Sequence, residues 1–292
     1  LSPSKVISNP LMSSRRLFSK AHWLVVWALL PALDALGQET DQRGIEYGLA
    51  AELRYDDNIY LAESQAVDSM ILEAVPFVRA TLYNQGNTYQ FGYRLNHAQY
   101  FDASDDNYDD HELALDINHR FAQRHAVAVK AEYKMLTEER GTGFSEEPNA
   151  VTDHPDDYVH ENLDVKYLLG VPTADLRFEF SAGRDVLNFD SSYVGDSRDY
   201  RADQLGVLAR YRLGSRTDLL MEYLNLDVKY DNTPLDFNGQ PLNLDSNEDY
   251  LLTGIGWELT AKTRGEIKVG HSARDYDTED FSSSDFHWQA EV

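Results

Sequence analysis

Residues 126–137 read AVAVKAEYKMLT, and this stretch decides the fold class. Its apolar side chains alternate with charged ones, so that Val127, Val129, Ala131, Tyr133 and Met135 stand against Lys130, Glu132 and Lys134. Successive side chains of a β-strand point to opposite faces, whereas a helix would repeat every three to four residues. The stretch therefore predicts a strand with one apolar face and one charged face.

The same alternation recurs along the chain in runs of about ten to fourteen residues, which is the length that a tilted strand needs to cross a bilayer. We count twelve such runs, at residues 45–55, 69–83, 88–101, 111–121, 126–137, 158–169, 174–184, 201–213, 217–230, 249–260, 265–276 and 285–292. The run at 217–230 departs from the pattern, because Glu222 interrupts whichever face is taken as apolar. We expect a bulge or a rim position there.

The connections between the runs alternate in length. Tight turns are expected at 84–87, 122–125, 170–173, 214–216 and 261–264, and long polar loops at 56–68, 102–110, 138–157, 185–200, 231–248 and 277–284. Outer-membrane barrels have short periplasmic turns and longer extracellular loops, whereas a soluble sandwich has no reason to keep every long loop at one end. The sequence predicts an all-β protein, a transmembrane antiparallel up-and-down β-barrel of at least twelve strands.

Composition limits the other possibilities. The 292 residues include 50 Asp and Glu against 26 Lys and Arg, and no Cys. A net charge of −24 argues against a nucleic-acid partner, because such interfaces depend on basic residues that neutralise phosphates. The missing cysteines exclude thiol chemistry and disulfides. A mean hydropathy of −0.52 excludes a helical membrane protein. With 42% hydrophobic and 26% charged residues the chain can bury an interior, which excludes general disorder.

Residues 12–37 are typical of a secretory signal peptide. Arg15, Arg16 and Lys20 precede an apolar core, and a small-x-small cleavage site ends at Gly37. The arginine pair also resembles a twin-arginine export signal. We therefore interpret 1–11 as upstream, non-native translation, 12–37 as the signal peptide and 38–292 as the barrel, located in the outer membrane of a Gram-negative bacterium.

In such a barrel the apolar face meets outer-membrane lipid and lipopolysaccharide, and the charged face lines the lumen. Tyr and Phe near the ends of the runs suit interfacial girdles. Aromatic rings in the lumen would add sugar stacking, but the pattern puts most aromatic residues on the lipid side. The basic residues predicted to line the lumen and form the substrate path are Arg94, Lys130, Lys134, Lys166, Arg177, Arg210, Arg212, Lys268 and Arg274.

Two roles are open for these basic residues. They stand beside Glu132, Asp164, Glu179 and Glu258, so that the wall carries crossed charges. Such a wall offers weak, repeated contacts to hydroxyls and carboxylates, and weak multi-site binding keeps a ligand moving. The alternative is mutual salt bridging that stiffens the barrel.

Sharp catalytic motifs are missing from the sequence: no G-x-S-x-G, H-E-x-x-H or Walker A pattern occurs. Acidic clusters at 56–58, 105–110 and 153–157 are oxygen-rich, as calcium prefers, but none has the spacing of a known calcium loop, so solvated loops are the simpler interpretation. We expect no enzyme activity, catalytic residue, metal site or cofactor.

Four blocks resemble an outer-membrane β-barrel porin family found with exopolysaccharide and capsule biosynthesis operons. They are 53–60 (LRYDDNIY), 109–113 with 124–125, 139–143 (ERGTG), and 257–270 (WELTAKTRGEIKVG). The likeness covers about residues 45–292. It implies a pore for a surface polysaccharide, working with a periplasmic and inner-membrane export machine, and brings no catalytic residues.

The last run ends at FHWQAEV without the terminal aromatic residue that barrels present for assembly, which indicates a C-terminally truncated fragment. Three functions fit these strands. Export of a surface polysaccharide, exopolysaccharide or capsule, is favoured by the resemblance. A general or nutrient-uptake diffusion porin fits equally well, and an outer-membrane enzyme acting on an envelope polymer comes third.

Overall fold

The computed structural model describes residues 43–62, 64, 66–138, 155–171, 173–190, 198–233, 242–260, 263–277 and 282–291. The predicted upstream segment, the signal peptide and the 139–143 block lie outside these residues. Within them, one 3-10 helix, η1 (Ser104–Asp106), accompanies twelve strands. No helix in this part of the chain has the length and apolar character to cross a membrane.

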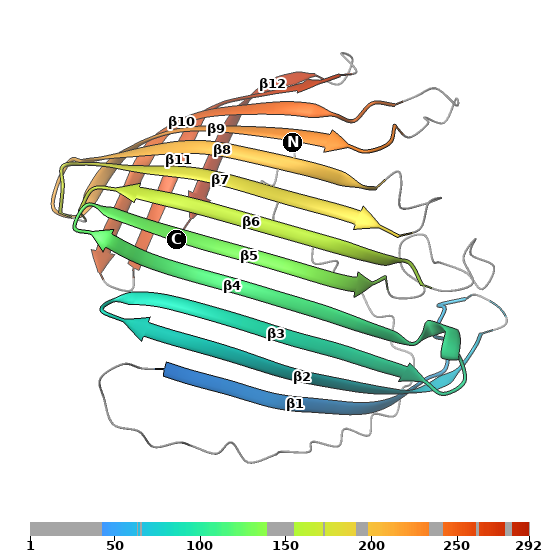
Figure 1. The fold of residues 1–292 in the computed structure, drawn as a ribbon. Helices are drawn as coiled ribbons and strands as arrows, with labels where there is room; N and C mark the ends of the chain where they lie inside the picture. Colours follow the sequence, from blue (N-terminus) through green and yellow to red (C-terminus); the bar gives the residue numbers. More distant parts are fainter. Residues whose placement is uncertain are drawn as a thin grey trace.

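The twelve strands form one antiparallel sheet in sequence order (Figure 1). They are β1 (Arg43–Asp56), β2 (Ser69–Asn84), β3 (Asn87–Tyr100), β4 (Tyr108–Ala122), β5 (His125–Thr137), β6 (Asp157–Leu169), β7 (Leu176–Phe189), β8 (Tyr200–Arg212), β9 (Thr217–Tyr230), β10 (Ser246–Thr260), β11 (Thr263–Tyr276) and β12 (Ser283–Glu291). The predicted all-β, up-and-down fold is confirmed. Each predicted run falls within a strand or overlaps it by most of its length.

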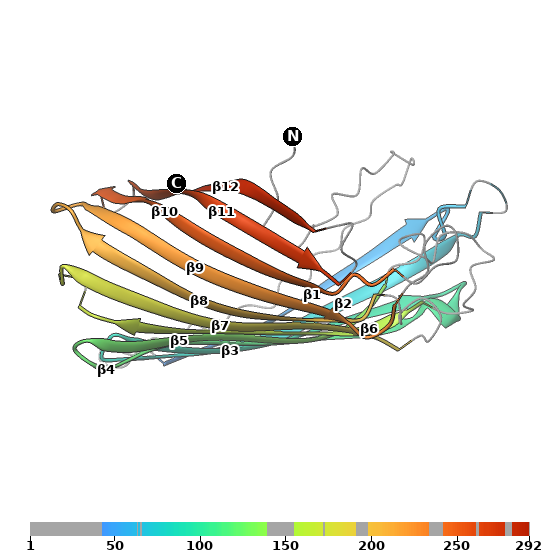
Figure 2. The same ribbon diagram turned by 90° about the horizontal axis from the view of Figure 1, so that it is seen from above.

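The sheet is a curved trough whose edge strands are β1 and β12 (Figure 2). The described residues do not close it into a ring. The tight turns gather at one end of the trough and the long connections at the other (Figure 1). We call these the turn end and the loop end.

Strands reach further toward the loop end than the sequence pattern predicts. The predicted run at 174–184 becomes β7, which continues to Phe189, and the run at 249–260 begins at Ser246 in β10. The long loops are correspondingly shorter. The added residues of β10 (246–248, SNE) are all polar, and those of β7 (185–189, DVLNF) place the apolar Leu187 and Phe189 on the face of Arg177 and Asp185, so neither extension continues the apolar–charged alternation of its run.

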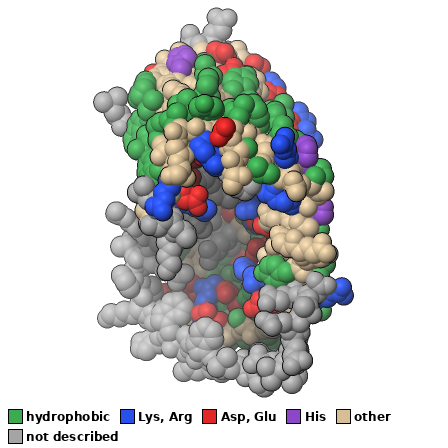
Figure 3. Space-filling model, turned by 90° about the vertical axis from the view of Figure 1, so that its left-hand side faces the viewer, with side chains coloured by type: hydrophobic (Ala, Val, Ile, Leu, Met, Phe, Trp, Pro, Cys, Tyr) green, Lys and Arg blue, Asp and Glu red, His purple; other side chains and the backbone are tan. Residues whose placement is uncertain are grey.

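The convex face of the trough is apolar and open to the surroundings. Leu205, Met221 and Leu251, on β8, β9 and β10, keep 62%, 58% and 63% of their surface exposed. Figure 3 shows hydrophobic side chains over the outside of the trough and charged side chains around the hollow. A soluble protein buries such residues, whereas a barrel turns them toward lipid.

Aromatic and histidine rings form a girdle on the convex face near the turn end. The ring of His119 lies 6.2 Å from that of Phe121, which lies 5.8 Å from His125, which in turn lies 6.0 Å from Tyr167. The hydroxyl of Tyr89 also hydrogen-bonds Nδ1 of His119. Amphipathic rings of this kind suit the boundary between lipid and water.

The expected bulge at Glu222 is wrong. β9 pairs with both β8 and β10 without a shift of register, and Glu222 stands opposite Leu208 and Leu252 on the concave face. The alternation failed because β9 also carries apolar side chains on this face, such as Leu220 and Leu224. Register shifts do occur near two tight turns, between Arg120 and Ala122 and between Glu258 and Thr260.

Close packing of β10 against β11 depends on glycine. A Cβ on Gly254 would clash with the carbonyl oxygen of Ile267, whereas a Cβ on Gly92, also on the concave face, would meet nothing within 4 Å. Gly254→Ala is expected to lower the free energy of unfolding by about 1–3 kcal/mol, because backbone atoms have to move. Gly92→Ala is expected to be neutral or slightly stabilising.

Urea titration of both variants folded into liposomes measures this difference. Equal stabilities for the two variants would show that the β10–β11 contact is not as close as described.

Candidate functional site

The concave face carries the charged residues. Arg94 of β3 stands opposite Glu112 of β4, which stands opposite Lys134 of β5, and directly opposed residues share a face. Following the register across the sheet places all nine predicted lumen residues on this face: Arg94, Lys130, Lys134, Lys166, Arg177, Arg210, Arg212, Lys268 and Arg274. Their role in a substrate path stays a prediction.

Most of these basic side chains are in ion pairs with neighbouring strands or with their own strand. The pairs are Arg94–Glu112 at 3.4 Å, Lys134–Glu132 at 2.6 Å, Lys166–Glu179 at 3.0 Å, Arg177–Asp218, Arg210–Glu266 at 3.0 Å and Arg274–Glu248 at 2.7 Å. Arg212 donates to the carbonyl oxygen of Thr173 at 2.9 Å. The wall therefore presents charges of both signs that largely neutralise one another.

Lys268 of β11 is the centre of the densest ion-pair cluster. Its Nζ lies 2.5 Å from Glu222 Oε2 and 3.2 Å from Glu266 Oε1, and its side chain is only 9% exposed. Glu266 is shared with Arg210, so three strands are tied together here. The sequence could not single out Glu222 or Glu266 as partners, because both choices depend on the register.

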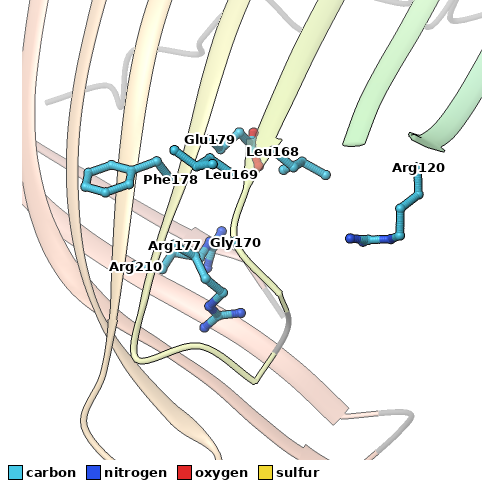
Figure 4. A pocket seen from close by; sticks show the side chains of 8 residues that line it. All are labelled: Arg120, Leu168, Leu169, Gly170, Arg177, Phe178, Glu179 and Arg210. Atoms are coloured by element: carbon cyan, nitrogen blue, oxygen red, sulfur yellow. The ribbon is translucent and has the colours of Figure 1, made fainter. Parts of the chain in front are cut away.

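A groove of about 720 Å³ opens at the turn end of this wall, lined by Lys166, Arg177, Arg210, Arg216, Glu258 and Lys268 among others. A smaller pocket of about 180 Å³ adjoins it, and Figure 4 shows Arg177 and Arg210 close together there, with Arg120 on the other side of the space. Basic and acidic groups alternate around the groove, so it resembles a charged entry rather than a closed binding pocket.

The loop end of the concave face has a different chemistry. A row of aromatic residues, which we call the aromatic collar, follows the wall from β4 to β11: Tyr108, Tyr158, Phe189, Tyr200, Tyr230 and Tyr276. Tyr158 and Phe189 are direct partners with ring centroids 5.0 Å apart, and Tyr200 and Tyr230 are direct partners at 6.1 Å. Most aromatic residues of the strands face outward, as predicted, whereas the aromatic collar on the concave face was not predicted from the sequence.

Carboxylates at this end accept hydrogen bonds from Tyr200 of the collar and from other neighbouring side chains. Asp185 accepts hydrogen bonds from the Tyr200 hydroxyl at 2.6 Å and from Asn162 at 3.2 Å, and lies 2.9 Å from Nε2 of His160. Glu248 accepts from Arg274 at 2.7 Å and from the Tyr250 hydroxyl at 2.6 Å. Buried polar groups need such partners, so the acidic residues of this end are largely structural.

The first long connection packs onto the concave face at the loop end. Ile59 is buried against Ile71, Ala98 and Tyr100, and the Tyr60 hydroxyl donates to Asp106 of η1 at 2.8 Å. The connection thus narrows the trough beside β2 and β3.

The acidic clusters hold their own neighbours in place. Asp56 Oδ1 accepts from the Asn58 amide at 3.0 Å, and Asp106 binds Tyr60 as described. Among the described residues no group of three or more His, Asp and Glu is arranged to hold a metal ion. Asp153 and His154 of the third cluster lie outside the described residues.

Comparison with known proteins agrees with this architecture. A family model described as "Putative beta-barrel porin 2" matches residues 32–288, which is most of the chain. A search of curated proteins found no match. With an apolar convex face and a charged concave face on one meandering sheet, the chain belongs to this family of outer-membrane β-barrel porins.

Proposed function

We propose that this porin is an outer-membrane pore through which a surface polysaccharide, exopolysaccharide or capsule, leaves the cell. The observation that carries the proposal is the paired-charge wall of the concave face, from Arg94 on β3 to Arg274 on β11. The sequence resemblance to porins found with polysaccharide operons supports the same proposal.

A polymer has to slide along the whole wall, so any single strong site would hold it. Because most of these cations already have a carboxylate partner, a passing hydroxyl or uronic carboxylate exchanges with a partner of similar strength. Many weak contacts replace one strong contact. The energy for transport comes in this proposal from periplasmic and inner-membrane export proteins.

The test is a clean deletion of the complete gene, complemented in trans, with polysaccharide measured separately on the cell surface and in the periplasm. Loss from the surface with accumulation in the periplasm is the expected result. Unchanged surface polymer together with reduced uptake of small solutes would overturn the proposal and leave a diffusion porin.

Complementation with point variants links the phenotype to the wall. Lys130→Gln removes a concave-face cation, and Arg184→Gln removes one from the convex face, where Arg184 binds Asp203 at 2.6 Å. We expect Lys130→Gln to reduce surface polymer and Arg184→Gln to leave it unchanged, at equal protein levels in the outer membrane. Equal effects would argue against a substrate path along the concave face.

A further inference from the structure

The aromatic collar has no task in the paired-charge mechanism. Its residues lie on the concave face, so they do not form a lipid girdle like the rings of the convex face. The wall of a water-filled pore normally carries polar side chains, because the exposure of apolar rings to water is unfavourable. A repeated row of them on neighbouring strands calls for a ligand that has apolar surface of its own.

We infer that the aromatic collar is a carbohydrate-binding site at the loop end of the pore, and that it takes the C–H faces of pyranose rings, whether or not the sugar is charged. The inference rests on the proposed function, since it names the part of a polysaccharide that the wall recognises. A pyranose has an apolar face and a polar edge, and Tyr has the same two characters.

The rings are held ready for such contacts. The Tyr200 hydroxyl is fixed on Asp185, and Tyr158, Tyr200, Tyr230 and Tyr276 are each partly exposed rather than buried. Phe189 is the buried base of the row, with the guanidinium of Arg198 4.1 Å from its ring centroid. Preorganised rings lose little conformational entropy when a ligand binds.

Hydrogen-bonding groups stand beside the rings. Arg274 lies with its guanidinium 5.9 Å from the Tyr276 ring and binds Glu248, and His160 and Asn162 lie next to Tyr200 through Asp185. Sugar hydroxyls require donors and acceptors at the edge of a stacked ring. The loop end offers both kinds of contact, whereas the groove at the turn end offers mainly charges.

The collar also has the extent of a polymer site. It runs from β4 to β11, and neighbouring strands are about 4.8 Å apart, which gives an arc of roughly 34 Å around the wall. Six of the eight strands along this arc carry a ring of the collar, so a chain that leaves the pore here passes close to one. We therefore expect weak binding that many positions share.

Binding is tested on the full protein purified from outer membranes in detergent, by calorimetric titration with maltohexaose, a neutral glucose hexamer. The Tyr200→Ala/Tyr230→Ala variant is expected to raise Kd about tenfold, which corresponds to about 1.4 kcal/mol. Tyr211→Ala, on the convex face of the same strand, is the matched control and is expected to leave Kd unchanged.

The Tyr200→Phe variant distinguishes a purely structural role of the residue from binding of sugar by its ring. This variant loses the hydrogen bond to Asp185 and keeps the ring, so it is expected to bind the hexamer within about twofold of the native protein. No binding by the native protein, or equal Kd values for the native protein and the double alanine variant, would overturn the inference.

The outcome is independent of the deletion experiment. Hexamer binding that depends on the collar, in a strain whose surface polymer survives deletion of the gene, would reject export and keep the carbohydrate site. Loss of surface polymer without hexamer binding would keep export and reject the collar as a sugar site.

Discussion

Ala209→Arg is expected to lower the free energy of unfolding by about 2–4 kcal/mol, the largest effect that we predict for a single substitution. Ala209 lies on the convex face of β8, midway along the apolar positions that run from Leu205 to Leu213. A guanidinium at this depth has to enter hydrocarbon or distort the bilayer to reach water.

The measurement is reversible unfolding in urea of the protein folded into liposomes. Gln204→Arg on the same strand is the control, because Gln204 faces the concave side, where arginine is already common. We expect the control to change stability by less than about 0.5 kcal/mol. If both variants lost the same stability, the assignment of the two faces to lipid and water would be wrong.

Lys268→Met is expected to destabilise the protein by about 2–3 kcal/mol. The change removes the cation between Glu222 and Glu266 and leaves the Glu222 carboxylate without its partner in a half-buried place. Removal of one member of a fully buried pair costs more, but both glutamates here keep about a fifth of their side-chain surface exposed.

A double-mutant cycle separates this loss of pairing from a loss of packing. Adding Glu222→Gln to Lys268→Met neutralises the stranded carboxylate, so most of the lost stability should return. Glu266 keeps its second partner, Arg210, in both variants. Additive losses in the cycle would show that the Lys268–Glu222 contact contributes little.

The sheet could be predicted from sequence because its two faces meet opposite surroundings. In residues 126–137 the convex positions from 127 to 135 are all apolar and the concave positions from 130 to 134 are all charged, and β5 occupies the same residues with one added at its start. The regular alternation of tight turns and long loops then gave the up-and-down order without any tertiary information. Membrane-crossing strands are easy to recognise from sequence, since few polar residues occur on the face that contacts lipid.

The ion-pair partners and the aromatic collar could not be predicted in the same way. Lys268 meets Glu222 across β10, and only the register of two strand pairs brings them together. Tyr158, Tyr200 and Tyr230 lie at the ends of β6, β8 and β9, where the alternation of apolar and charged residues weakens. One signal was available in the sequence. Each tyrosine lies an even number of residues from charged residues of the same strand, so it shares the charged face with them.

The strict neighbour order of the sheet has a consequence for how this protein changes over evolution. Among the described residues each strand forms backbone pairs only with the strands next to it in sequence, so a hairpin such as β4 and β5 is paired to the rest of the sheet through its two outer edges alone. Duplication or loss of one hairpin keeps every later strand pointing in its original direction and every tight turn at its original end. Because barrel diameter grows with strand number, the width of the channel can be altered in steps of two strands without redesign of either face.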